Sequence, residues 1–147
     1  MLKLKPRMLL TAFGGLCMLT APAGAAMAAK FQAVLNGDKE LVPGDADGWG
    51  RARIRIDDSL NRLCADLEVR SVTKVTSAHI FRGAAGEQGT PVVKLDTPDD
   101  DDSDDCDAIG DTLADEIQAN PAGFYVSITT LEHPKGALRG QLAPGGD

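Results

Sequence analysis

The side chain best suited to catalysis or metal binding in this chain of 147 residues is that of His79. It lies in the strand-like run 76–83 among small, β-branched and apolar residues. Such a histidine can bind a metal, act as a general base or pack structurally. A zinc or copper site generally needs about three or four protein ligands. The other histidine, His133, precedes Pro134 in a turn-like segment and offers no obvious second ligand. We therefore interpret His79 as a packing residue beside Phe81.

Nucleophilic catalysis is not predicted. Ser77 and Ser127 lie near His79 in the strand pattern, but neither stands in a motif that forms a sharp nucleophile turn. Arg139 and Gln141 alternate outward on the last strand-like run. That arginine can bind a carboxylate, although an arginine at such a place more often closes the fold by hydrogen-bonding a loop. The sequence accordingly predicts no catalytic residue and no enzyme.

Acidic residues gather in the segment 96–111, which holds nine aspartates in sixteen residues. Like charges at this density keep a segment solvated, so we expect an acidic loop. Closely spaced carboxylates also suit calcium, but neither this segment nor the D-x-D-G stretch at 45–48 fits an EF-hand loop. No cofactor is expected beyond weak calcium association. The weak metal candidates are His79, Asp45, Asp47, Asp99, Asp100, Asp101 and Asp102.

Residues 1–28 have the features of a secretory signal peptide. Lys3, Lys5 and Arg7 precede an apolar run that is too short to span a bilayer, and Ala26-Met27-Ala28 forms an A-x-A cleavage site. We expect the mature domain, residues 29–147, to be periplasmic or secreted, with no stable membrane anchor once the signal is removed.

The charge of the mature domain restricts its partners. Without the three cations of the signal, the 15 basic residues become 12 against 22 acidic ones, a net charge of −10. Such a charge opposes binding to nucleic acid or to anionic lipid. The length of the domain allows a single hydrophobic core. An unknown protein or cell-envelope ligand is the partner that we expect.

Hydrophobic periodicity predicts an antiparallel all-β fold. In the run 49–56, small and branched apolar residues alternate with three arginines, and 63–69 resumes the alternation after a turn at 57–59. These two runs predict a hairpin, with arginines opposite Asp66 and Glu68 on its outer face. One helix is predicted over 112–119, capped by Asp111. Further strands are predicted at 31–35, 73–81, 91–95, 124–130 and 137–142.

Two cysteines remain after signal removal. Cys64 and Cys106 form an even pair, which in an oxidising compartment predicts a disulfide bond. Cys64 faces outward by the strand alternation, whereas Cys106 lies in the acidic segment. The bridge is therefore expected to pin that segment to the outer face of the hairpin, near its arginines.

The runs "AHIFRGAAGEQGTPVVKL" (78–95) and "LADEIQANPAGFYVSITTLEHPKGALRGQL" (113–142) resemble the CHRD (chordin-type) domain, a module common in exported bacterial proteins. The opening "FQAVLNGDKELVP" (31–43) is also similar. The resemblance implies an immunoglobulin-like or superoxide-dismutase-like antiparallel β-sandwich, here with one short helix, and no established catalytic activity. The residues that carry the family motif are His79, Gly83, Gly86, Gly89, Tyr125, Arg139, Gly140 and Gln141.

The chain departs from this family pattern at two positions. Phe81 stands where the family usually has the second histidine of His-Ile-His, and Thr129 stands where a third histidine is usual. Because residues two apart in a strand share a face, the family residues would lie together like metal ligands. Their absence favours an exported, non-enzymatic binding or structural module, with a weak calcium or transition-metal protein as the alternative.

Overall fold

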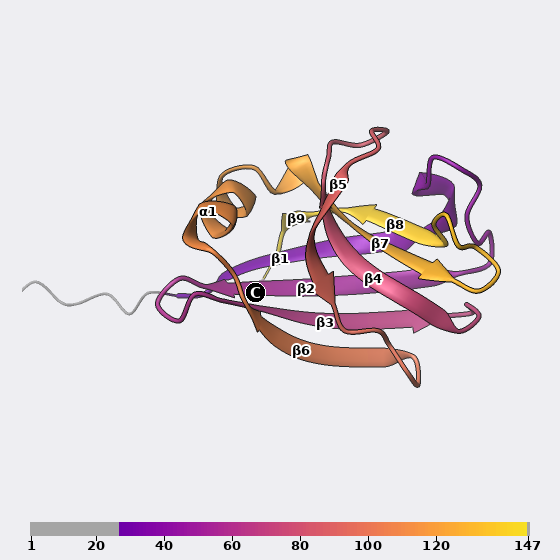
Figure 1. Cartoon of the computed structure of the whole chain (residues 1–147), viewed down its shortest axis with the longest axis horizontal. Helices are drawn as coiled ribbons and strands as arrows, with labels where there is room; N and C mark the ends of the chain where they lie inside the picture. The colour runs from indigo at the N-terminus through magenta and orange to yellow at the C-terminus, as the bar shows by residue number, and fades with distance from the viewer. Residues whose placement is uncertain (1–26, 147) are drawn as a thin grey trace, which may run out of the picture.

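The computed structural model describes residues 27–146, which form a strongly bent antiparallel sheet with one α-helix (Figure 1). Apart from Met27 and Ala28, the predicted signal peptide lies outside the described residues. Within the described part of the chain, no helix is long and apolar enough to cross a membrane.

Eight strands form one continuous hydrogen-bonded path, in the order β5-β4-β7-β8-β1-β2-β3-β6, and the short β9 pairs with β1. The path folds over on itself, so that its two halves share one hydrophobic core (Figure 1). This confirms the predicted all-β, sandwich-like class. The strands are β1 (Ala29–Asn36), β2 (Trp49–Asp57), β3 (Arg62–Arg70), β4 (Val75–Arg82), β5 (Thr90–Leu95), β6 (Asp102–Ala108), β7 (Phe124–Thr130), β8 (Leu138–Gln141) and β9 (Ala143–Pro144).

The hairpin of β2 and β3 follows from the alternation in its sequence. Its alternating apolar residues from Ala52 to Val69 point into the core, whereas the arginines of β2 are exposed or half-buried on the other face, where Arg51 lies over the ring of the partly buried Trp49. Arg53 pairs with Asp66 at 3.3 Å across the strands, as the outer-face pattern predicts. The buried side chains of the hairpin are Ala52, Ile54, Ile56, Leu63, Ala65, Leu67 and Val69.

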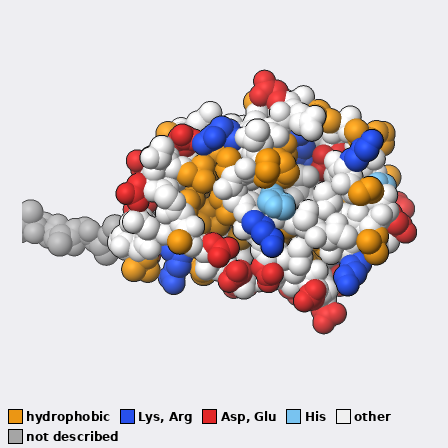
Figure 2. All heavy atoms as spheres, in the orientation of Figure 1, with side chains coloured by type: hydrophobic (Ala, Val, Ile, Leu, Met, Phe, Trp, Pro, Cys, Tyr) orange, Lys and Arg blue, Asp and Glu red, His pale blue; other side chains and the backbone are white. Residues whose placement is uncertain are grey.

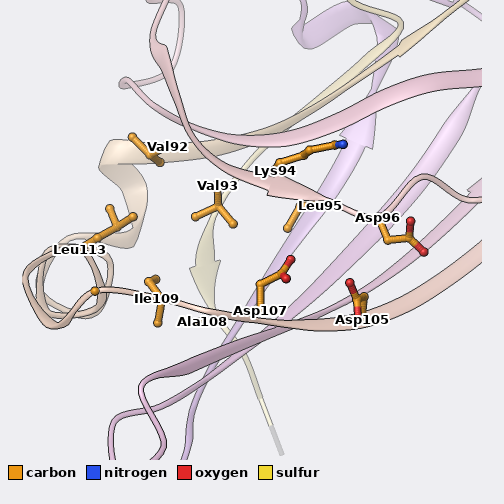
Figure 3. A pocket seen from close by; sticks show the side chains of 11 residues that line it. Val92, Val93, Lys94, Leu95, Asp96, Asp105, Asp107, Ala108, Ile109 and Leu113 are labelled. Carbon is orange, nitrogen blue, oxygen red and sulfur yellow. The ribbon is translucent and has the colours of Figure 1, made fainter.

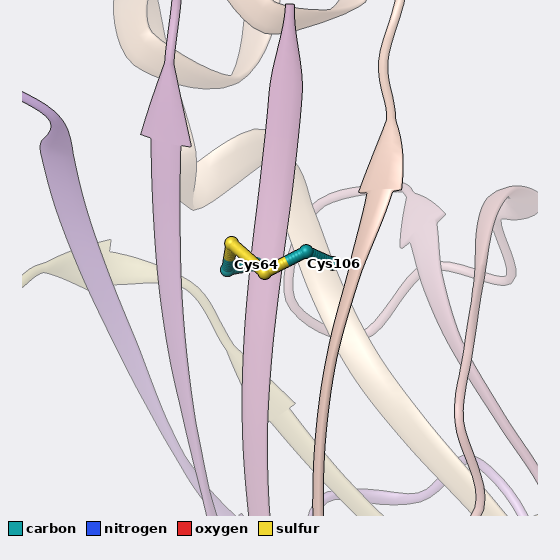
Figure 4. Close-up of a disulfide and its surroundings, with 2 residues drawn as sticks. All are labelled: Cys64 and Cys106. Atoms are coloured by element: carbon teal, nitrogen blue, oxygen red, sulfur yellow. A yellow bond between two sulfur atoms is a disulfide. The ribbon is translucent and has the colours of Figure 1, made fainter. Parts of the chain in front are cut away.

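The prediction that 96–111 is entirely an acidic loop is wrong for its centre, because residues 102–108 form strand β6. This strand pairs with β3 along its whole length, and Cys106 lies directly opposite Cys64. The predicted disulfide joins these two residues (Figure 4). Aspartates disfavour strands, but here their side chains stay exposed while the ladder and the bridge hold the backbone.

The helix α1 (Asp111–Ala119) covers one end of the core. Ala114 and Ile117 are buried and Asp115 and Glu116 are exposed, which matches the predicted amphipathic pattern. The predicted capping by Asp111 is wrong, because Gly110 is the N-cap and Asp111 is the first helical residue. Short 3-10 turns, Gly37–Lys39 and Pro121–Gly123, lie beside β1 and β7.

Candidate functional site

The candidate functional side chains of this part of the sequence lie together on the outer face of strands β5, β4, β7 and β8. The register places Lys94 opposite His79, His79 opposite Ser127, and Ser127 opposite Arg139, in one row across the four strands. Phe81 and Tyr125 form a second pair in the neighbouring row. Four strands thus bring together side chains that the sequence separates widely.

His79 packs against an aromatic neighbour. Its ring meets the ring of Phe81 edge-on, with 6.0 Å between the centroids. Partial burial, together with the nearby charge of Lys94, lowers the pKa of His79 below its ordinary value. Ser127 lies across the strand pair, but its hydroxyl is directed to Glu40. The packing contact with Phe81 is the one that the structural interpretation of His79 expects.

Arg139 is the most deeply buried charge at this site, with 3% of its surface exposed. Its guanidinium lies over the ring of Tyr125, 3.5 Å from the centroid, and that ring stacks on Phe81 at 5.0 Å. Its Nη2 atom donates hydrogen bonds to the carbonyls of Ala84 and Glu87, at 3.0 and 2.8 Å. Arg139 therefore fastens the 83–89 loop to the sheet while keeping its charge satisfied.

Two other residues of the family motif hold the same loop. The hydroxyl of Tyr125 accepts a hydrogen bond of 3.0 Å from the backbone N–H of Gly89. Gln141 uses its side-chain amide to donate to the carbonyls of Gly83 and Ala122, each at 2.7 Å. The loop is thus fixed at both ends and in the middle by side chains from β7 and β8.

The motif glycines allow this close packing. A Cβ atom on Gly89 would lie 2.1 Å from the carbonyl oxygen of Arg82, and one on Gly140 would lie 2.2 Å from that of Val34. Gly86 has a positive φ of 79°, a conformation that other residues rarely adopt. The glycine spacing of the motif is therefore explained by backbone approach and turn geometry.

Glu40 joins the site from the loop after β1, a contribution that the sequence analysis missed. The hydroxyl of Ser127 donates to Glu40 Oε1 at 2.7 Å. Burial raises the pKa of Glu40, against the lowering effects of this hydrogen bond and of the Arg139 charge. No sequence spacing connects Glu40 with Ser127, since 87 positions separate them.

A shallow pocket of about 330 Å³ lies above these residues. Its floor is formed by Phe81, Tyr125 and Arg139, and its rim includes Leu41 and Val42, which are about half exposed. Arg139 is already hydrogen-bonded to the loop, whereas the aromatic stack and the half-exposed apolar rim remain available. Such a pocket suits contact with the surface of a bound partner. The Ser127 hydroxyl, which also lines this pocket, donates its hydrogen to Glu40 Oε1.

The two residues that differ from the family pattern, Phe81 and Thr129, both make contacts within the sheet. Phe81 takes part in the aromatic stack. Thr129 shares hydrogen bonds with the hydroxyls of Thr76 and Ser77, at 2.9 and 2.7 Å. Both positions therefore contribute packing or hydrogen bonds on the outer face of the sheet.

The weak metal candidates are placed in separate structural roles. Asp45 accepts hydrogen bonds from the backbone N–H groups of Asp47 and Gly48 and so shapes a turn. In the segment 99–102, the carbonyl of Asp101 accepts from the N–H of Val69. Among residues 27–146, no three His, Cys, Asp or Glu side chains are grouped to hold a metal ion.

A family model described as the CHRD domain matches residues 31–142, which include every strand from β2 to β8 and most of β1. The match includes all the motif residues that hold the 83–89 loop. No curated protein and no solved structure shows a significant match to the chain.

Proposed function

Because the chain belongs to the CHRD domain family, we propose that it is an exported, non-enzymatic binding module of the cell envelope. The observation that carries this proposal is the use of the family motif. The motif forms hydrogen bonds to the backbone of the 83–89 loop through the side chains of Arg139, Tyr125 and Gln141. These bonds hold the loop in one position, so that it offers a fixed surface to a partner.

The cysteine bridge supports the exported part of the proposal. Cys64 and Cys106 are joined in the structure, and stable disulfides belong mainly to oxidising compartments. The predicted signal peptide also supports export to the periplasm or the medium. A surface of fixed loops on a sandwich scaffold is also the usual way in which such modules recognise partners.

Photo-crosslinking in the cell that exports the protein tests this function. A photoreactive residue is placed at Val42, on the rim of the outer-face pocket, or at Val92, on the edge strand β5. Leu60, an exposed residue in the β2–β3 turn, is the matched control. We expect one discrete protein or glycan adduct at Val42 or Val92 and none at Leu60. No adduct at either position, or the same adducts at all three, would contradict a specific binding module.

Metal titration separates this function from the metalloprotein alternative. The chelator-stripped mature domain is titrated with calcium, copper and zinc by calorimetry, and its unfolding is followed in parallel. We expect no stoichiometric heat and no thermal shift at ~1 mM metal, because a ligand that binds only the native state must raise its stability. A tightly held stoichiometric ion would replace the binding-module proposal.

A further inference from the structure

The sheet of this protein does not close. β5 and β6 are the two ends of the hydrogen-bonded path, and within residues 27–146 the outer edge of neither pairs with another strand. Unpaired N–H and C=O groups at such edges are a template for an added strand. A hydrogen bond of 3.2 Å from Ser103 Oγ in β6 to the carbonyl of Asp96, the residue after β5, bridges the two edges at one end.

Between these two edges lies a groove of about 660 Å³ (Figure 3). One wall is mainly apolar and combines Val92, Val93 and Leu95 of β5 with Ile109 and Leu113 near the start of α1. Lys94 of β5 also lines the groove, but its amine is directed away from the aspartates of the opposite wall. Val92, Val93 and Leu113 are only partly buried and pack against the core. Figure 2 shows the corresponding apolar area between α1 and β5. The core is therefore incompletely covered at this opening.

The opposite wall is acidic. In the register with β3, Asp105 and Asp107 lie opposite Ala65 and Leu63, whose side chains point into the core. The two aspartates therefore project toward the inner side of β6, into the groove, as Figure 3 shows. Asp96 lines the same space from the β5 side. Acidic side chains also follow β6 along the surface in Figure 2.

Inward-pointing charges on an edge strand protect a protein from indiscriminate edge-to-edge pairing, and Pro91 in β5 has the same effect. Protection of this kind rejects apolar and anionic strands. One class of strand remains that the groove accepts. A lysine or arginine can pack its apolar stem on the partly buried Val93 and Leu113 and place its charge beside Asp105 or Asp107.

We propose that the groove between β5 and β6 binds an extended, basic segment of a partner protein, which adds as a strand and directs lysine or arginine side chains inward. This proposal rests on the proposed function as a binding module and names the site and the chemistry of its partner. The added strand would satisfy exposed backbone groups and cover the apolar wall.

The test uses a fluorescent eight-residue peptide of alternating lysine and threonine, titrated into the oxidised mature domain at low ionic strength. One control peptide has glutamate in place of lysine. A second keeps every side chain but carries N-methyl groups at alternate residues, which removes strand hydrogen bonds. We expect saturable binding of the first peptide alone, together with slower amide exchange in β5 and β6.

Variants of the protein locate the binding. Asp105→Asn with Asp107→Asn preserves side-chain shape and is expected to weaken binding roughly tenfold, since two charge pairs are lost. Asp38→Asn with Asp47→Asn removes the same charge from the 37–48 loop and is expected to leave the affinity unchanged. Thermal unfolding checks that both variants are folded.

Equal binding of the N-methylated peptide, equal loss in both double variants, or no saturable binding of the lysine peptide would overturn the proposal. These outcomes are distinguishable from failure of the proposed function. A discrete crosslink at Val42 without peptide binding would retain the binding module and reject this site, whereas no crosslink at Val42 or Val92 would reject the module itself.

Discussion

Two parts of the molecule fasten a peripheral segment to the same sheet in different ways. At the free edge of the β2–β3 hairpin, the strand β6 is held to β3 by a backbone ladder and by the Cys64–Cys106 bridge. On the outer face of β4, β7 and β8, where loops cover the side chains and bury them, the 83–89 loop is held by Arg139, Tyr125 and Gln141. Polar groups contribute little where water competes and much where it is excluded. The acidic segment therefore needs a covalent tie, whereas the glycine-rich loop does not.

The disulfide should have the largest effect on this comparison. Replacing both Cys64 and Cys106 by alanine removes a crosslink between residues 42 positions apart. The loop-entropy model gives a loss of about 4 kcal/mol in the free energy of unfolding, as an upper value. Chemical denaturation measures the loss, and amide exchange should accelerate in β6 before the 83–89 loop. An unchanged unfolding midpoint would show that the ladder alone holds β6.

Arg139→Ala should have the next largest effect. This substitution removes two hydrogen bonds to loop carbonyls and the cation over the Tyr125 ring. It also leaves the half-buried Glu40 without its countercharge. We therefore expect the free energy of unfolding to fall by about 3 kcal/mol. The matched control is Arg53→Ala, which breaks the exposed pair with Asp66 and should cost less than about 1 kcal/mol. Equal losses in the two variants would remove the distinction between the covered and the exposed face.

The smallest effect is a change in pH dependence. Burial raises the folded-state pKa of Glu40 above the ordinary value of a glutamate, so the folded protein binds this proton more tightly than the unfolded chain does. The contribution of this proton to the free energy of unfolding is fully present at pH values below the pKa of the unfolded chain. It is lost as the pH rises through the raised pKa of the folded protein. Glu40→Gln should abolish this loss, and Glu132→Gln, at an exposed position, controls for net charge. Denaturation curves at several pH values measure it, and parallel profiles for wild type and Glu40→Gln would contradict the assignment.

The exposed half of the fold was largely predictable from local pattern. Alternation in 49–56 and 63–69 identifies the hairpin and its core-facing side chains, because one face of each strand meets water. The same rule fails for β6, since aspartate has a low strand propensity and the strand depends on its partner β3. Pairing between Cys64 and Cys106 was the one sequence signal that placed this segment beside the hairpin.

The covered half was less predictable, because its contacts join residues far apart in the chain. Strand β7 is buried on both faces, so its outward residues show no simple polar alternation. The family resemblance identified Arg139, Tyr125 and Gln141, but their shared attachment to one loop emerges only from the fold. Glu40 lies in the stretch 31–43 that resembles the family, but nothing in that stretch links it to Ser127, because loop conformation alone brings the two residues together.

Amide hydrogen exchange in Arg139→Ala tests the central claim, that the family motif holds the 83–89 loop, most directly. In the native protein the N–H of Gly89 is donated to the Tyr125 hydroxyl, and that of Gly83 to the carbonyl of Gly123. We expect exchange at Gly83 and Gly89 to accelerate at least roughly tenfold in the variant and to stay faster than exchange in β2 and β3, whose core amides respond only to the lower global stability, because opening of the loop is local. Unchanged exchange at both glycines in a folded variant would contradict the account.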